Sequence, residues 1–288
     1  MFDIITDSTA NLPEEIIDEF DIKVISVPYF IGGKEYQGYE KGKKPHLKEF
    51  YDAMRKGEVA TTAQMSRESC RNAFESSLEE GRDFIYIGFS SALSGMMNTA
   101  SLVADELRKE YPERKFYVID SLSASMGQGL LVYYAAVARQ EGKDIDEVKA
   151  SVEEKIPKLC HWFTVDDLKY LKRGGRISST TALVGTLMGI KPILHVDDKG
   201  RIVSVGKVRG RRNSIEEVFK RMKERCLDTE DQMIFIAHSD CENDAKYLAS
   251  LVKNEYKVKG LKIGYIDAVI GAHSGPGTLA VFFLGTER

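Results

Sequence analysis

The feature that most constrains the fold of this chain is the alternation of short apolar runs with helix-like stretches in its first half. The apolar runs predict strands at residues 2–6, 23–30, 84–89 and 115–119. Between them, the pattern predicts helices over residues 13–20, 45–55, 95–111 and 127–141. Strands that alternate with helices form βαβ units, which build a mostly parallel sheet with helices on its faces. We therefore expect an α/β fold.

The second half of the chain has a different pattern. It contains strand candidates at residues 191–196, 201–208, 233–238, 262–269 and 279–284. The sequence Asp197-Asp198-Lys199-Gly200 suits a tight hairpin turn between the first two of these strands. A hairpin predicts a mixed sheet rather than a second parallel one. We expect a domain at 1–158 and another at 159–288.

Charge and the cysteine pattern exclude several classes of protein. Lys and Arg total 41 against 44 Asp and Glu, so the net charge of −3 argues against a general nucleic-acid binder. The longest apolar run, residues 129–138, is about half of the roughly 20 residues that a membrane span needs. The first residues lack the basic region of a signal peptide. Neither paired cysteines nor clustered histidines indicate a metal site. We expect a cytoplasmic protein without bound metal.

Hydroxyl-rich loops follow several of the predicted strands. They lie at residues 6–9, 90–95, 120–125 and 238–240, and a similar cluster at residues 61–66 comes just before a helix. The carboxyl ends of parallel strands share one edge of a sheet, where ligands bind. Hydroxyls and helix N-terminal amides suit an anion such as a carboxylate or a phosphate. Helix capping explains any single loop, but five of them together predict a ligand site.

Other motifs leave three functions open. Ser94-Gly95, followed by Met96 and Met97, suits an anion beside an apolar ligand, and His273 lies in a glycine-rich stretch. Ser90 or Ser94 could serve a hydrolase or transferase, since residues 88–92 nearly match a nucleophile elbow. The basic clusters at residues 172–176 and 207–212 could bind a phosphorylated metabolite, contact a partner that carries phosphate groups, or simply be solvated surface. Neither a P-loop nor a dinucleotide fingerprint is present.

Taken in order, these stretches resemble the DegV family, the bacterial fatty-acid-binding group that includes the FakB subunits of fatty acid kinase. The matching stretches span nearly the whole chain, at residues 6–9, 62–66, 90–95, 120–129, 171–178, 190–194 and 271–277. The resemblance implies an N-terminal three-layer α/β/α domain with a parallel sheet and a C-terminal two-layer α/β domain with a mixed sheet. It also implies a buried tunnel between them for a long-chain fatty acid.

The resemblance further implies a carrier that is not catalytic alone. A separate kinase subunit binds ATP and phosphorylates the fatty-acid carboxylate to an acyl-phosphate, so the chain needs no cofactor of its own. The expected partners are a long-chain fatty acid and that kinase. A transient contact with the membrane surface is open, and no nucleic-acid partner is expected.

Residue by residue, the resemblance assigns carboxylate binding to Thr62, Ser94, the amide of Gly95 and His273. Arg176, in the Gly-Gly-Arg motif, and Arg209 should lie near the head group or the kinase-docking face. The sequence departs from the family pattern where Ala63 and Met65 replace a serine and a proline, so Thr61 is a second candidate for the role of Thr62. Met96 and Met97 replace a threonine and an aromatic residue.

Overall fold

The computed structural model describes residues 2–178, 189–227 and 229–288. The first half forms a four-stranded sheet in the order β2-β1-β6-β7, and all of its strand pairs are parallel. Its strands are β1 (Phe2–Asp7), β2 (Ile22–Ile25), β6 (Asp83–Gly88) and β7 (Phe116–Asp120). The parallel sheet expected from the alternating pattern is thereby confirmed.

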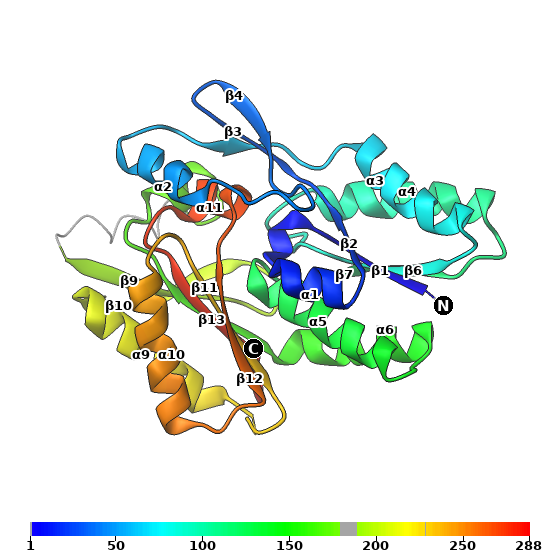
Figure 1. Ribbon diagram of the computed structural model, residues 1–288. Coiled ribbons are helices and arrows are strands. Elements are labelled where there is room, and N and C mark those ends of the chain that lie inside the picture. Colours follow the sequence, from blue (N-terminus) through cyan, green and yellow to red (C-terminus); the bar gives the residue numbers. More distant parts are fainter. Residues whose placement is uncertain (1, 179–188, 228) are drawn as a thin grey trace.

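Helices cover both faces of this sheet, because successive strand residues point to opposite sides. Ile5, Phe84 and Tyr86 pack against α3 (Arg67–Glu79) and α4 (Met96–Glu110). Ile4 and Ile85 pack on the other side, against α1 (Glu14–Glu19), α5 (Met126–Gln140) and α6 (Ile145–Lys155). The result is a three-layer α/β/α arrangement (Figure 1).

A six-stranded mixed sheet forms in the second half, in the order β10-β9-β8-β13-β11-β12. Its strands are β8 (Leu159–Thr164), β9 (Ile190–Val196), β10 (Ile202–Arg209), β11 (Met233–His238), β12 (Gly260–Tyr265) and β13 (Leu279–Leu284). Only β11 and β12 pair in parallel. The predicted hairpin joins β9 to β10, where the amide of Gly200 donates to the Asp197 carbonyl over 2.8 Å.

The two faces of the mixed sheet have different neighbours. One face packs against α9 (Arg211–Arg225) and α10 (Glu242–Glu255). The other face, which includes Phe163 and Phe282, shares a core with α5. Since α5 also packs on the parallel sheet, this helix lies between the two sheets and joins them (Figure 1).

The prediction of one strand over residues 23–30 was wrong. The chain leaves the parallel sheet after Ile25 and starts β3 (Pro28–Ile31), because Pro28 has no N–H to donate to a strand ladder. β3 pairs with β4 (Lys34–Gln37) and β5 (Thr61–Thr62) in a small antiparallel sheet.

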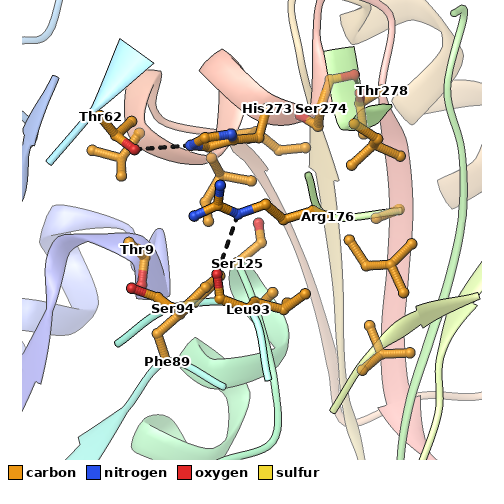
Figure 2. Close-up of a pocket in the computed structure, with 18 of the residues that line it drawn as sticks. Thr9, Thr62, Phe89, Leu93, Ser94, Ser125, Arg176, His273, Ser274 and Thr278 are labelled. Carbon is orange, nitrogen blue, oxygen red and sulfur yellow. Dashed lines mark hydrogen bonds between the residues drawn. The ribbon is translucent and has the colours of Figure 1, made fainter. Parts of the chain in front are cut away.

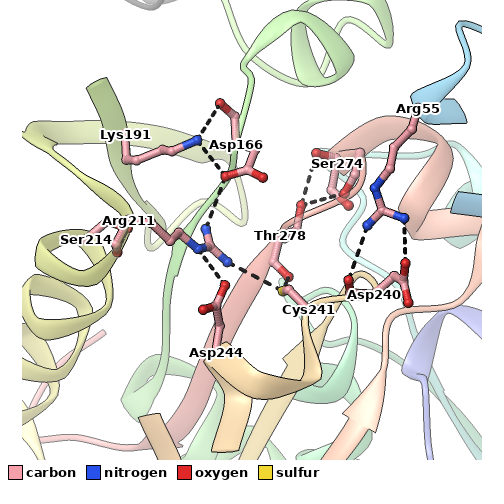
Figure 3. A network of polar contacts seen from close by, with 11 residues as sticks. Arg55, Asp166, Lys191, Arg211, Ser214, Asp240, Cys241, Asp244, Ser274 and Thr278 are labelled. Carbon is pink, nitrogen blue, oxygen red and sulfur yellow. Dashed lines mark hydrogen bonds and ion pairs between the residues drawn. The ribbon is translucent and has the colours of Figure 1, made fainter. Parts of the chain in front are cut away.

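The helix α2 (Leu47–Arg55), which comes from the first half of the chain, packs on the second half. The hydroxyl of Tyr51 donates to the Ile266 carbonyl over 2.8 Å. The side chain of Arg55 pairs with Asp240, which follows β11 (Figure 3). α2 therefore holds the end of β12 and the segment after it.

The strand predicted over residues 262–269 is too long. β12 ends at Tyr265, and the next segment forms α11 (Ala268–Ser274). The Asp267 side chain caps this helix by accepting from the Ile270 amide over 2.9 Å, and Gly275 ends it with a φ of +81°. His273 consequently lies on a helix instead of in a loop. Among the described residues, no helix is long and apolar enough to cross a membrane.

Candidate functional site

A cavity lies between the two sheets and receives side chains from both halves of the chain. The space inside it has a volume of about 830 Å³, which includes the part open to solvent. Most of the lining is apolar: Val27, Ala63, Phe89, Leu93, Met96, Ala124, Phe163, Leu171, Val196, Ile202, Ile266, Val269, Ile270, Ala280 and Phe282. Its polar residues are Thr9, Thr62, Ser94, Ser125, His161, Arg176, His273, Ser274 and Thr278. The size and composition suit a small ligand with an apolar body.

Thr62 and His273 form a polar pair at the half-buried end of the cavity. Oγ1 of Thr62, on β5, lies 2.8 Å from Nε2 of His273, on α11 (Figure 2). Burial, with Arg176 and Arg173 nearby, lowers the pKa of His273 to about 4. His273 is therefore neutral at pH 7, and the pair offers hydrogen bonds rather than charge.

The glycine at position 174 gives the His273 ring its space. Gly174 ends α7 (Lys169–Arg173), and a Cβ atom there would lie 2.3 Å from Nδ1 of His273. Gly175 follows with a φ of +71°, which turns the chain toward Arg176. The Gly-Gly-Arg motif thus packs one glycine on the histidine and directs the arginine into the cavity.

Among the described residues that line the cavity, Arg176 is the only arginine or lysine. Its Nε donates to the Leu93 carbonyl over 3.2 Å, and Nη1 donates to the Gly174 carbonyl. Burial lowers the pKa of Arg176. Figure 2 places its guanidinium between His273 and Leu93. Since the part of the lining that the structure describes contains no carboxylate, this cation is available to an anionic group.

The apolar part of the cavity extends along two neighbouring strands. Phe163 pairs with Ala280, and His161 pairs with Phe282, so all four lie on one face of the sheet. Thr278, near α11, comes just before this stretch of β13. Along an extended strand, Phe282 lies roughly 13 Å from Thr278. The cavity is therefore long, with a half-buried polar end and a buried apolar end.

Comparison with known proteins agrees with this architecture. The model of the DegV family matches residues 1–286. The chain belongs to the DegV family. A DegV domain-containing protein from Clostridium perfringens is 44% identical and covers 100% of this chain and 98% of its own length. The membership of the DegV family that the sequence motifs predicted is confirmed.

Solved DegV structures share the fold. A DegV lipid-binding protein from Thermotoga maritima is 28% identical, with a TM-score of 0.87 and 100% coverage of both chains. A fatty-acid-binding DegV family protein from Thermus thermophilus is also 28% identical, with a TM-score of 0.88 and 99% coverage of both chains. A DegV fatty-acid-binding protein from Bacillus subtilis is 27% identical, with a TM-score of 0.81 over 99% of each chain.

The DegV motifs do not all reach the cavity. Thr62, Ser94, His273 and Arg176 line it. The other three predicted residues lie outside that lining. Thr61 is exposed and pairs with Phe30 in the small sheet. Gly95 is the N-cap of α4 and lies against Gln64, and the side chain of Arg209 is exposed at the end of β10.

The two methionines after Ser94-Gly95 also differ in position, since one lines the cavity and the other does not. Met96 lines the cavity. Met97 packs in the core of the parallel sheet, where its sulfur would lie 2.5 Å from a Cβ atom at Gly88. Only the first methionine can therefore shape the ligand space.

Sequence reasoning missed five polar residues of the lining: Thr9, Ser125, His161, Ser274 and Thr278. Thr9 and Ser125 lie in hydroxyl-rich loops that the sequence did single out. Ser274 is buried, and its Oγ has no hydrogen-bond partner among the residues that the structure describes. As the next residue after His273, Ser274 adds a free hydroxyl to the polar end.

The turn after α11 is held by a polar network (Figure 3). Oγ1 of Thr278 donates to the carbonyls of Ser274 and Gly275 over 3.0 and 2.9 Å. Asp166 contacts Gly277 so closely that a Cβ atom there would lie 2.1 Å from Oδ2, and Lys191 pairs with Asp166 over 2.6 Å. These contacts fix the end of the helix that carries His273.

The hydroxyls proposed for a hydrolase are placed unfavourably for that chemistry. Oγ of Ser90 is fully buried and donates to the Gly200 carbonyl over 2.8 Å. Oγ of Ser94 accepts from the Met96 amide over 3.4 Å. Ser123 contacts His161, but Ser123 is outside the cavity lining. Within residues 2–178, 189–227 and 229–288, no group of three or more His, Cys, Asp or Glu side chains could hold a metal ion.

Proposed function

We propose that this chain binds a long-chain fatty acid with its carboxylate at the Thr62–His273 end of the cavity. The observation that carries the proposal is the polarity of that cavity. Thr62, Ser94, Arg176 and His273 are half-buried, whereas Phe163 and Phe282 at the other end are buried. A carboxylate needs donors and access to water, and an alkyl chain needs neither. Fatty-acid binding by related DegV proteins supports this assignment.

The apolar walls supply most of the binding free energy. Each buried methylene contributes about 0.8 kcal/mol, so a chain of about 14 methylenes gives ~11 kcal/mol before association costs. The head-group contacts then decide orientation. Thr62 and Ser274 offer hydroxyls, and Arg176 offers a charge-assisted hydrogen bond.

The half-buried head-group end also suits transfer chemistry by a partner. We propose that the bound carboxylate is presented to a separate ATP-dependent kinase, which converts it to an acyl-phosphate. The carboxylate oxygen attacks the γ-phosphorus of ATP, and ADP leaves. The exposed Lys172 and Arg173, next to this end, suit an acidic or phosphate-bearing surface. Arg209 would act on the same docking face rather than on the fatty acid.

The same cavity fits a small phosphorylated metabolite less well than a fatty acid. Of the lining residues that the structure describes, Arg176 is the single Lys or Arg side chain, and most of the others are apolar. A phosphate ester of small size would leave most of these apolar surfaces in contact with water. The basic residues at 207–212 lie outside the cavity lining.

Mass spectrometry of the purified protein tests the binding step. Under native conditions we expect one bound long-chain acid per chain, which solvent extraction then releases for identification. Ser94→Ala and His273→Ala should retain less of it, whereas Ser101→Ala, on the exposed side of α4, should match the parent protein. A chain that is empty and also ignores added fatty acid after delipidation contradicts the proposal.

The presentation step needs a separate assay. The loaded protein, ATP and a fatty acid kinase subunit should together yield acyl-phosphate, trapped with hydroxylamine as the hydroxamate. Loaded protein with ATP alone should yield none. Binding without any product in the complete mixture would leave the carrier assignment standing and refute the kinase role.

A further inference from the structure

The basic cluster at residues 207–212 contains one arginine that differs from its neighbours. Lys207, Arg209 and Arg212 are exposed. The side chain of Arg211 is only 22% exposed. Arg211 is the first residue of α9, where a cation opposes the positive end of the helix dipole. Its charge is therefore unfavourable for the helix itself, and the contacts that stabilise it lie outside α9.

The guanidinium of Arg211 contacts three groups at once (Figure 3). Its Nε donates to Oδ2 of Asp244 over 2.8 Å. Its Nη2 donates to Sγ of Cys241 over 3.4 Å, and its Nη1 lies 3.6 Å from Oδ1 of Asp166. Cys241 is the N-cap of α10 and Asp244 lies in its first turn, while Asp166 follows β8. One planar fork therefore joins α9 to two other segments of the second half.

Two of these contacts continue to the turn at residues 274–278, at the end of α11. Oδ2 of Asp166 packs against the backbone of Gly277, where a Cβ atom would collide with it. Sγ of Cys241 donates to the Thr278 carbonyl over 3.3 Å. Burial raises the pKa of Cys241 to about 12, so the thiol keeps the proton that it donates. The guanidinium thus reaches the turn along two routes.

This turn fixes the C-terminal end of α11, whose last residues are His273 and Ser274. Both line the fatty-acid cavity. Gly275 and Gly277 adopt φ values of +81° and +78° and offer no side chains to pack, so the turn depends on contacts from neighbouring segments. A shift of the turn would move His273 relative to its partner Thr62.

We propose that Arg211 is a positioning residue for the fatty-acid carboxylate, because it holds the turn that sets the place of His273. This role rests on the fatty-acid binding proposed above. Arg211 lies outside the cavity lining that the structure describes, so it acts through the turn. Lys191 also pairs with Asp166 over 2.6 Å, so the loss of Arg211 should loosen the turn rather than release it. The expected effect on fatty-acid affinity is therefore moderate.

Displacement of a fluorescent fatty acid from the delipidated full chain measures this effect. Arg211→Met should lower the affinity for myristic acid about threefold or more, which lies within the range that one hydrogen bond contributes. The affinity for myristyl alcohol should fall less, because the alcohol carries no charge for the head-group residues to recognise. Arg212→Met is the matched control, since it removes the same charge from an exposed neighbour that pairs with Glu216. It should bind both ligands as the parent does.

A double-variant cycle tests whether Arg211 acts through His273. In the His273→Ala background, Arg211→Met should cause little further loss of affinity for myristic acid, because the group that it positions is gone. Arg211→Lys should not restore the parent affinity, because an ammonium lacks the planar fork that reaches several partners. Additive losses, full rescue by lysine, or equal losses for myristic acid and myristyl alcohol overturn the proposal.

Amide hydrogen exchange of the ligand-free chain provides a readout that does not depend on the fatty acid. The amides of Gly275 and Gly277 each donate to a carbonyl over 2.8 Å. Both should exchange about threefold faster or more in Arg211→Met, and at the parent rate in Arg212→Met. Unchanged exchange in Arg211→Met overturns the proposal. A parent protein that binds neither myristic acid nor its alcohol refutes the proposed function instead, and the exchange rates then decide whether Arg211 holds the turn.

Discussion

Replacing Gly174 by alanine should disturb the head-group site through a single contact. The new Cβ would lie 2.3 Å from Nδ1 of His273, whereas ordinary contacts begin at 3.4 Å, so the ring must shift by 3.4 − 2.3 = 1.1 Å. The backbone itself accepts alanine, since φ is −73°. Because Nδ1 and Nε2 lie on opposite sides of the imidazole ring, this shift pushes Nε2 against Thr62, so the ring must rotate and the 2.8 Å hydrogen bond between them is lost.

The expected result is a modest and specific loss of affinity for fatty acid. One neutral hydrogen bond contributes about 0.5–1.5 kcal/mol, so the dissociation constant of Gly174→Ala should rise about two- to twelvefold. Displacement of a fluorescent fatty acid from delipidated protein measures it. Urea unfolding of the same variant without ligand reports its stability separately.

Gly175→Ala is the matched control. Its Cβ would have nothing within 4 Å, but its φ of +71° is unfavourable for alanine. The free energy of unfolding should therefore fall by about 1 kcal/mol while fatty-acid affinity stays at the parent value. The reasoning is refuted if Gly174→Ala binds like the parent, or if Gly175→Ala loses as much affinity.

Three further variants probe other parts of the molecule. The pKa of His273 is lowered to about 4 in the folded protein, so between pH 6.5 and 4 the unfolded chain binds a proton that the folded protein does not. The free energy of unfolding in urea should therefore fall as the pH drops through this window, and less steeply in His273→Gln. Ala280→Leu fills the buried end of the cavity and should shift competition binding toward shorter fatty acids; unchanged preference would place the chain elsewhere. The buried Arg288 donates hydrogen bonds to the carbonyls of Leu122 and Ile156 over 2.5 and 2.8 Å. Arg288→Ala should therefore lower the free energy of unfolding, measured in urea, by about 2 kcal/mol, and a loss under about 0.5 kcal/mol would show that these bonds contribute little.

The parts of the fold that local pattern determines were predictable. The parallel strands of the first half and the hairpin at residues 197–200 follow from apolar runs and turn residues close together in the chain. The small sheet of β3, β4 and β5 was not predictable, because the two residues of β5 pair with β3 across about 30 positions of sequence. α11 was missed because its cap, Asp267, follows an apolar strand without any helical periodicity before it.

The site shows the same division. Hydroxyl-rich loops after strands indicated the neighbourhood of Thr9, Thr62, Ser94 and Ser125, all of which line the cavity. Which hydroxyl of a loop faces inward depends on strand register, so Thr61 and Thr62 were indistinguishable from sequence. His161 sits in the middle of an apolar strand, and only the pairing of β8 with β13 shows which face it occupies.

The walls of the fatty-acid cavity come from both ends of the polypeptide. Thr9 follows the first strand and Phe282 belongs to the last, and both line the same space. During synthesis, the final strand of the mixed sheet leaves the ribosome after every other wall has been made. A nascent chain therefore has no enclosed space for an acyl group until β13 has been made. Loading must follow the folding of this strand, and lipid can stabilise only a chain in which β13 is in place, not the intermediates that lead to it.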